Sequence, residues 1–194
     1  MGSKSFSVES FRFLSAVDAS NPKWLEWSRV YEYELAIEAL AQYGASKDSL
    51  IHNTCWGFHG CHVLFRDELA GLYPKTIHSD LKASPDPNTI VYDVTKRPSA
   101  ELTRCFDFVL NISTLEEIPG KQWKVFRNLM QMVRPGGYLI TTFDYPGLNL
   151  QAFERRLGLK IASPDHLLTG KTSIVPNPMW EYLSVGALVV RKRA

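Results

Sequence analysis

The sequence predicts an α/β protein, with a doubly wound, mostly parallel sheet that has helices on both faces. Two observations lead to this class. First, strand-like and helix-like segments alternate along the 194 residues, a pattern typical of parallel sheets with helical crossovers. Second, the apolar run 106–110 is nearly continuous, as expected of a strand buried on both faces. Such a strand has no solvent-facing side, so helices must cover both faces of the sheet.

The segment after this run predicts a helix, a turn and a second strand. Apolar residues recur at helical spacing in a single stripe, formed by Trp123, Phe126, Met130 and Val133. Pro135 and the pair Gly136-Gly137 end this helix, because proline cannot continue a helix and glycine tolerates positive φ at its end. A strand over 138–143 follows.

The chain before the first predicted strand falls into two parts. Residues 1–23 carry scattered polar residues and are predicted to form an irregular N-terminal arm. The longest predicted helix, 24–43, lies between Pro22 and Gly44, which are typical boundary residues. Its two apolar stripes predict packing on more than one side. One stripe consists of Trp24, Trp27, Tyr31 and Leu35, and the other of Val30, Tyr33, Ile37 and Leu40.

The other predicted elements continue the alternation of strands and helices. The strands are 49–53, 76–79, 89–92, 160–162 and 185–190, and the helices are 59–73 and 150–157. Together with the two strands above, they predict a seven-stranded sheet. We therefore expect a single domain over 24–194, made of the helix 24–43 and a core over 49–194.

Composition and charge narrow the class of protein. A hydrophobic content of 45% and a charged content of 22% are ordinary globular values. The net charge of +2 gives no reason to expect a nucleic-acid partner, and the basic cluster 191–193 is predicted to be a solvated tail. No apolar run approaches the roughly 18 residues of a membrane span, and no signal peptide is recognisable. Three cysteines, an odd number, suit a reducing compartment, so we expect a cytoplasmic protein without a membrane partner.

The block 102–146 resembles the second half of the class I S-adenosylmethionine (SAM) dependent methyltransferases. In that family a strand beginning "F-D-x-V", here Phe106 to Val109, precedes a loop, a helix, a Pro-Gly-Gly turn and a further strand. The resemblance implies SAM as the cofactor, methyl transfer by in-line attack of an oxygen or nitrogen, and an antiparallel C-terminal strand. Besides the helix 24–43 and the loop 164–182, little of the chain could recognise an acceptor. A small molecule or a sugar unit is therefore the expected substrate.

The resemblance places the cofactor at the loop that follows the first strand of the core. Ligands of open α/β sheets bind where loops leave the carboxyl ends of the strands. The family has an acid followed by x-Gly-x-Gly there, and Asn53, Cys55 and Gly57 match the acid and the two glycines. Asn53 supplies no charge, however, and Cys55 has a Cβ where the family has none. The alternative is a non-catalytic binding or assembly module whose loop has lost the cofactor.

Four further residues are expected near the cofactor. Asp80 ends a strand about 20 residues beyond the glycine loop, where a carboxylate can accept hydrogen bonds from two ribose hydroxyls. Asp93 resembles the family position beside the adenine amino group, and Asn111 and Thr114 leave the next strand over the expected sulfur. Both aspartates have an alternative reading as turn residues.

The candidate catalytic residues are four side chains on the loops over the reaction centre. Glu116 or Glu117 is a candidate general base, although two adjacent acids are as often an exposed capping pair. Asp144 and Tyr145, at the end of the next strand, are alternative acid–base or acceptor-orienting groups. By the resemblance, the aromatic end of the helix 24–43 is expected to form part of the acceptor pocket.

Two other kinds of site are weighed and not favoured. His52, Cys55, His59, Cys61 and His62 lie close in sequence, and imidazole and thiolate bind zinc. No metal is expected, because Cys61 and His62 are adjacent in a helix and point to different faces. A nicotinamide-dependent enzyme would use Asp80 in the same way, but the Gly-x-Gly-x-x-Gly fingerprint is missing.

Overall fold

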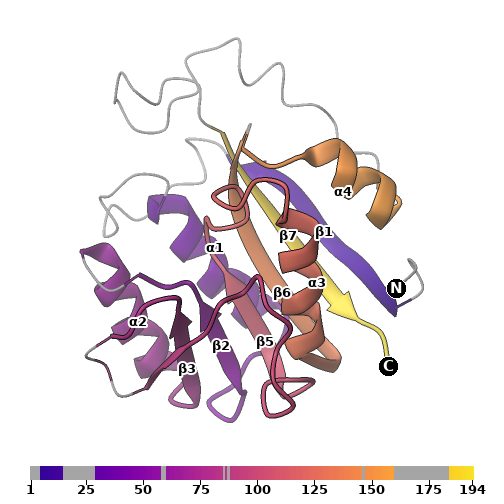
Figure 1. Ribbon diagram of the computed structural model, residues 1–194. Helices are drawn as coiled ribbons and strands as arrows, with labels where there is room; N and C mark the ends of the chain where they lie inside the picture. The colour runs from indigo at the N-terminus through magenta and orange to yellow at the C-terminus, as the bar shows by residue number, and fades with distance from the viewer. Residues whose placement is uncertain are drawn as a thin grey trace.

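The computed structural model of the 194-residue chain describes residues 5–14, 29–57, 60–84, 86, 88–145, 147–159 and 184–194. A seven-stranded sheet runs through it in the order β1-β7-β6-β5-β2-β3-β4 (Figure 1). The five strands from β6 to β4 are mutually parallel, and β7 is antiparallel to β6. The predicted α/β class, with its mostly parallel sheet and antiparallel C-terminal strand, is confirmed.

Apart from β1, the described strands and helices overlap the predicted segments. The strands are β1 (Phe6–Leu14), β2 (Ile51–Thr54), β3 (Thr76–Asp80), β4 (Thr89–Val91), β5 (Phe106–Asn111), β6 (Val133–Tyr145) and β7 (Ser184–Lys192). The helices are α1 (Arg29–Gln42), α2 (Cys61–Leu72), α3 (Gln122–Met132) and α4 (Leu150–Leu157). The predicted strand 160–162 and the start of the predicted helix 24–43, with Trp24 and Trp27, lie outside the described residues.

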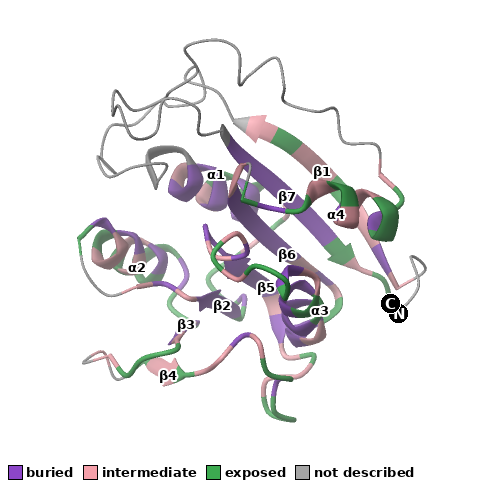
Figure 2. Cartoon of the chain, turned by 45° about the horizontal axis from the view of Figure 1, so that its top comes forward, coloured by how far each residue is buried: buried purple, intermediate pink, exposed green. Residues whose placement is uncertain are grey.

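Two apolar cores lie on opposite faces of the sheet, as Figure 2 shows in purple. On one face α1 and α2 pack on β2, β5 and β7 through Leu40, Phe65 and Val189. On the other face α3 and α4 pack on β5, β6 and β7 through Phe126, Phe153 and Leu188. Because neighbouring residues of β7 point to opposite faces, this one strand contributes to both cores. No helix of the described residues is long and apolar enough to cross a membrane.

The expected irregular arm is wrong for residues 6–14, which form the edge strand β1. Phe6, Val8, Phe11 and Phe13 all reach the core beneath α3 and α4. A register shift lies between Val8 and Ser10 where β1 pairs with β7. The bulge inserts one residue and lengthens the apolar spacing from two to three, so the alternation that signals a strand is broken.

The Pro-Gly-Gly segment also differs from its prediction, because it lies within β6 rather than before it. Val133 pairs with Phe106 and Tyr138 pairs with Phe108, so the intervening residues bulge from the ladder. Gly136 has φ of 83°, and a Cβ on Gly137 would lie 2.5 Å from the carbonyl oxygen of Asp107. Glycine is needed here for backbone conformation and for close approach of two strands.

The basic cluster near the C-terminus is not a solvated tail, since Arg191 and Lys192 belong to β7. The Lys192 ammonium donates to the carbonyl oxygens of Met130 at 2.9 Å and Val133 at 2.6 Å. These carbonyls lie at the C-terminal end of α3, where four backbone acceptors lack intrahelical partners. Lys192 therefore caps α3 from the neighbouring strand.

Candidate functional site

The crevice at the carboxyl ends of β2 and β5 is the switch point of the sheet. From β2 the chain continues to β3 and β4 on one side and then crosses to β5 on the other. A cavity of about 160 Å³ lies at this edge. Its wall includes Asn53, Gly57, Asp80 and Ser113. The fold thus brings together the loops that follow β2, β3 and β5, as the switch-point rule requires.

The turn after β2 keeps the backbone of a glycine-rich loop. Cys55 has φ of 55° and Gly57 has φ of 62°. A non-glycine residue in this region is strained by about 1–2 kcal/mol. Cys55 therefore adopts the conformation that favours glycine, at the position where the resembled family has its first glycine. Such strain is often found at functional sites.

The Cys55 thiol lies close to residues of three other loops, Asp80, Asp93 and Thr114. Burial, followed by the nearby Asp80 carboxylate, raises the pKa of its thiol to about 12, against a smaller lowering by hydrogen bonding to Thr114. Asp93 is also near enough to raise this pKa. At neutral pH the thiol is protonated, so Cys55 is not poised as a nucleophile.

Asp80 lies at the cavity wall with both oxygens oriented by backbone amides. Its Oδ2 accepts a hydrogen bond from the Gly57 amide and its Oδ1 one from the Lys82 amide, each at 3.2 Å. A carboxylate oxygen has a second lone pair, so each can accept a further bond. The arrangement suits a hydroxyl-rich ligand, and the ribose role of Asp80 stays a prediction.

Asn53 and His52 make buried polar contacts with β3 on opposite faces of the sheet. The Asn53 Nδ2 lies 3.3 Å from His78 Nδ1, and His52 Nε2 lies 2.9 Å from Ser79 Oγ. Burial lowers the pKa of His52 to about 3 and that of His78 to about 4, so both imidazoles are neutral. Within the described ranges, which omit His59, no group of three or more potential ligands could hold a metal ion.

Asn111 and Asp93 do not line the cavity. Each forms a hydrogen bond with another residue of the protein. The Asn111 side chain is fully buried and its Nδ2 donates to Thr54 Oγ1 at 3.0 Å. Ile112 and Ser113 take its expected place in the cavity wall. Asp93 Oδ1 accepts from the Thr95 amide at 2.8 Å, and bonding to Thr95 lowers the pKa of Asp93. This contact is that of a turn residue.

Aromatic side chains fill much of the remaining crevice. Trp56 is 5% exposed and its ring lies 5.5 Å from that of His78. Tyr33 of α1 stacks on Phe65 at 3.9 Å, and its hydroxyl is hydrogen-bonded to His62 Nδ1. Because ligand pockets typically enclose about 300–1,000 Å³, a ligand of cofactor size requires these side chains to move apart.

The predicted catalytic residues separate into two groups. Glu116 is largely buried, and its Oε1 accepts a hydrogen bond from the Asp144 amide at 2.8 Å. Burial, with smaller contributions from the charges of Asp144 and Glu32, raises the pKa of Glu116 to about 8. Glu117 is exposed, and Tyr145 packs edge-on against Phe13 with ring centres 5.6 Å apart. Of these four residues, only Glu116 and Asp144 are brought into contact, and neither is among the residues that line the cavity.

Sequence reasoning missed Glu32, a buried acidic residue whose charge contributes to the raised pKa of Glu116. Glu32 is fully buried on α1 and accepts hydrogen bonds from Ser113 Oγ at 2.8 Å and Thr142 Oγ1 at 2.5 Å. A signal was available, because Leu35, Ala36 and Ala39 share its helix face at spacings of three, four and seven. An acidic residue in the first turn of a helix, on the face that is buried, requires a polar partner.

Comparisons with known proteins identify the fold but not the activity. No protein-family profile matches the chain, and no curated protein matches it. A Burkholderia thailandensis 1,6-didemethyltoxoflavin-N1-methyltransferase, solved with S-adenosylhomocysteine, has a TM-score of 0.54 and 13% identity, over 84% of this chain and 79% of that chain. A Haemonchus contortus phosphoethanolamine N-methyltransferase, solved with SAM, has a TM-score of 0.54 and 13% identity, over 83% of this chain and 53% of that one.

A third similar structure has another activity. The [4+2]-cyclase SpnF has a TM-score of 0.51 and 12% identity, over 88% of this chain and 84% of that chain. The chain therefore has the Rossmann-like fold of the class I SAM-dependent methyltransferases. Because the same fold is found in a cyclase, the fold does not by itself assign methyl transfer.

Proposed function

We propose that the protein is a SAM-dependent methyltransferase that modifies an oxygen or nitrogen of a small molecule or sugar unit. The observation that carries this proposal is the Asp80–Gly57 hydrogen bond beside the positive φ of Cys55, at the switch point of a methyltransferase-like sheet. An acceptor-only carboxylate next to a close-approach turn fits a ribose and its attached amino-acid moiety.

The residues of the cavity wall fit SAM in chemistry. Asp80 would accept hydrogen bonds from the ribose hydroxyls, Gly57 would allow close approach of the backbone, and the Asn53 carbonyl would face the ammonium group. Bound SAM supplies an electrophilic methyl group, so the protein has mainly to orient the acceptor atom. Glu116 would take the acceptor's proton, and the basic form of Glu116 predominates only above its pKa of about 8.

Calorimetric titration of the full chain with SAM and with S-adenosylhomocysteine tests the proposal. Saturable binding of both, in the micromolar range typical of enzymes, is the expected result. Absence of binding by a folded protein would contradict the proposal. NAD(H) is the natural control ligand, because a nicotinamide-dependent enzyme would also use an acid at the end of β3.

A second candidate function is a non-catalytic binding or assembly module. It is favoured by the filled crevice, in which Trp56 is buried and the Tyr33–His62 hydrogen bond joins α1 to α2. A Tyr33→Phe substitution removes this bond and separates the two candidates. A methyltransferase whose crevice must open should bind SAM at least as fast as before, whereas a module that has lost the cofactor should bind none.

A further inference from the structure

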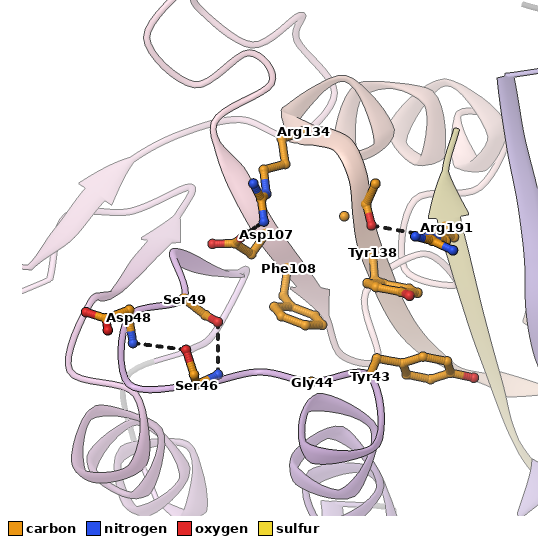
Figure 3. Close-up of a pocket in the computed structure, with 12 residues that line it drawn as sticks. Tyr43, Gly44, Ser46, Asp48, Ser49, Asp107, Phe108, Arg134, Tyr138 and Arg191 are labelled. Carbon is orange, nitrogen blue, oxygen red and sulfur yellow. Dashed lines mark hydrogen bonds and ion pairs between the residues drawn. The ribbon is translucent and has the colours of Figure 1, made fainter. Parts of the chain in front are cut away.

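A larger cavity, of about 570 Å³, lies at the other end of the parallel strands, where β5 and β6 begin (Figure 3). Its walls come from the turn after α1, the first residues of β5 and β6, and the end of β7. This volume is within the range of small-molecule pockets. The cavity shares no lining residue with the candidate site, so it is independent of the proposed function.

An aromatic wall forms one side of this cavity. The Tyr138 ring stacks on Phe108 with ring centres 5.6 Å apart and an angle of 13°. Tyr43 lies against the same ring at 4.8 Å. Phe108 is 4% exposed, whereas both tyrosines are partly exposed and available at the surface. Because Phe108 and Tyr43 already contact the Tyr138 ring, Tyr43 is the outer ring of this wall, on which a planar ligand ring could stack.

Two guanidinium groups lie beside this wall, as Figure 3 shows for Arg134 and Arg191. Arg191 lies over the Tyr138 ring at 5.6 Å, and its Nε donates to the Gly136 carbonyl at 3.3 Å. Arg134 forms an ion pair with Asp107, and 57% of its side chain is exposed. Both groups are therefore oriented in advance, and a guanidinium presents a planar fork to an oxyanion.

The acidic side chains of the cavity are already neutralised. Asp107 pairs with Arg134 and accepts the Leu50 amide at 2.7 Å. Asp48 pairs with Lys75 at 2.8 Å. Among the residues that the structure describes, Arg191 has no carboxylate partner. The cavity thus has an uncompensated positive charge beside stacked aromatic rings.

We propose that this cavity binds a phosphate monoester attached to a planar ring, a ligand of the nucleoside monophosphate class. The ring stacks on Tyr43 at the outer end of the aromatic wall, and the phosphate accepts hydrogen bonds from Arg191 and from the exposed side of Arg134. A phosphate monoester carries nearly two negative charges at neutral pH. Arg191 supplies the uncompensated positive charge, and Arg134, although paired with Asp107, adds a second planar set of N–H donors.

Calorimetry of the full chain with uridine monophosphate tests this site. The pyrimidine avoids competition with adenine recognition at the other edge. Arg191→Met keeps an unbranched side chain at this position and removes the guanidinium group, so it should weaken binding about 10-fold or more. Arg193→Met, a neighbouring arginine outside the cavity, is the matched control and should change the affinity less than about 2-fold. Arg191→Lys, which keeps the charge, should give an intermediate loss.

Three further titrations define the outcomes. Uridine and inorganic phosphate should each bind more weakly than the monophosphate, and saturating S-adenosylhomocysteine should leave its affinity unchanged. The proposal is overturned if wild-type protein fails to bind uridine monophosphate or if Arg193→Met weakens binding as much as Arg191→Met. Equal binding of phosphate alone, or displacement by S-adenosylhomocysteine, would also overturn it. Failure of S-adenosylhomocysteine to bind would count against the proposed methyltransferase and leave this test intact.

Discussion

The carboxylate of Glu32 accepts a hydrogen bond from the hydroxyl of Ser113, a residue 81 positions further along the chain. The same oxygen accepts from Thr142, whose own Oγ1 accepts the Ser113 amide at 3.1 Å. One buried side chain of α1 thereby fixes the ends of β5 and β6 at the cavity wall. Ser113 is held at φ of 42°, a conformation that needs such support.

Replacing Glu32 by leucine should lower the free energy of unfolding by about 1–3 kcal/mol, because two buried hydroxyls lose their acceptor. Glu32→Gln keeps a carbonyl acceptor and should cost less. Urea denaturation followed by circular dichroism measures both variants. A leucine variant as stable as wild type would show that the hydroxyls find other partners, since apolar replacement of buried charge is sometimes tolerated.

Asp80→Ala should weaken SAM binding by about 1–3 kcal/mol, the range for lost hydrogen bonds to a charged group. Asp48→Ala is the control, because Asp48 is exposed, pairs with Lys75 and does not line this cavity. Calorimetry on folded variants makes the comparison. If both variants bind like wild type, Asp80 is only a turn residue that orients the Gly57 amide.

Protein stability should fall as pH rises from 6.5 to about 8. Burial raises the pKa of Glu116 from 4.5 to about 8, so the folded state binds more protons than the unfolded state between these values. The free energy of unfolding therefore decreases through this window. His52 and His78 act in the opposite sense, but only below 6.5, because their folded pKa values are lowered.

Glu116→Gln tests the origin of this slope. The amide does not titrate, so the decrease between pH 6.5 and about 8 should largely disappear. Glu117→Gln alters the exposed neighbour and should retain the wild-type slope. Chemical denaturation at several pH values gives the comparison, and a slope lost equally in both variants would assign it to another group.

Gly186→Ala should destabilise the sheet severely, by about 2–4 kcal/mol, as expected for overpacking in a core. A Cβ at Gly186 would lie 2.3 Å from the ring of Phe143 on the adjacent strand. Gly71→Ala is the matched control, since no atom lies within 4 Å of a Cβ there and alanine favours the helix. Thermal unfolding should separate the two variants, and similar melting temperatures would contradict the close packing of β6 and β7.

Residue patterns predicted the central strands, because a strand that is buried on both faces has an apolar run that can be recognised from the local sequence alone. The run in β5 and the helical stripe of α3 are of this kind. β1 could not be recognised in this way, because its bulge breaks the alternation of apolar and polar residues between Val8 and Phe11. Its pairing with β7, at the other end of the chain, also leaves no local trace.

The candidate site was predicted in part for a similar reason. Asp80 and Gly57 occupy positions fixed by strand ends, and the fold brings them within 3.2 Å. Glu32, Tyr33 and His62 reach the site from helices. Their contacts depend on how α1 packs against β6 and α2, and sequence spacing within one segment does not encode this packing. The side chain of Asn111 is different, because alternation along β5 turns it to the opposite face from Leu110, where it bonds Thr54 of β2.

The pairing of β1 with β7 has a consequence for how the protein is made. Phe6 lies opposite Lys192, so β1, which is synthesised before the other strands that the structure describes, must wait for β7 before it can pair. Until then Phe6, Phe11 and Phe13 have no neighbouring strand and present an apolar edge open to other chains. Pairing of β1 therefore depends on contacts of very long sequence separation, which are slow to form. A chaperone that shields β1 until β7 has been synthesised would cover an apolar strand edge that is open to other chains.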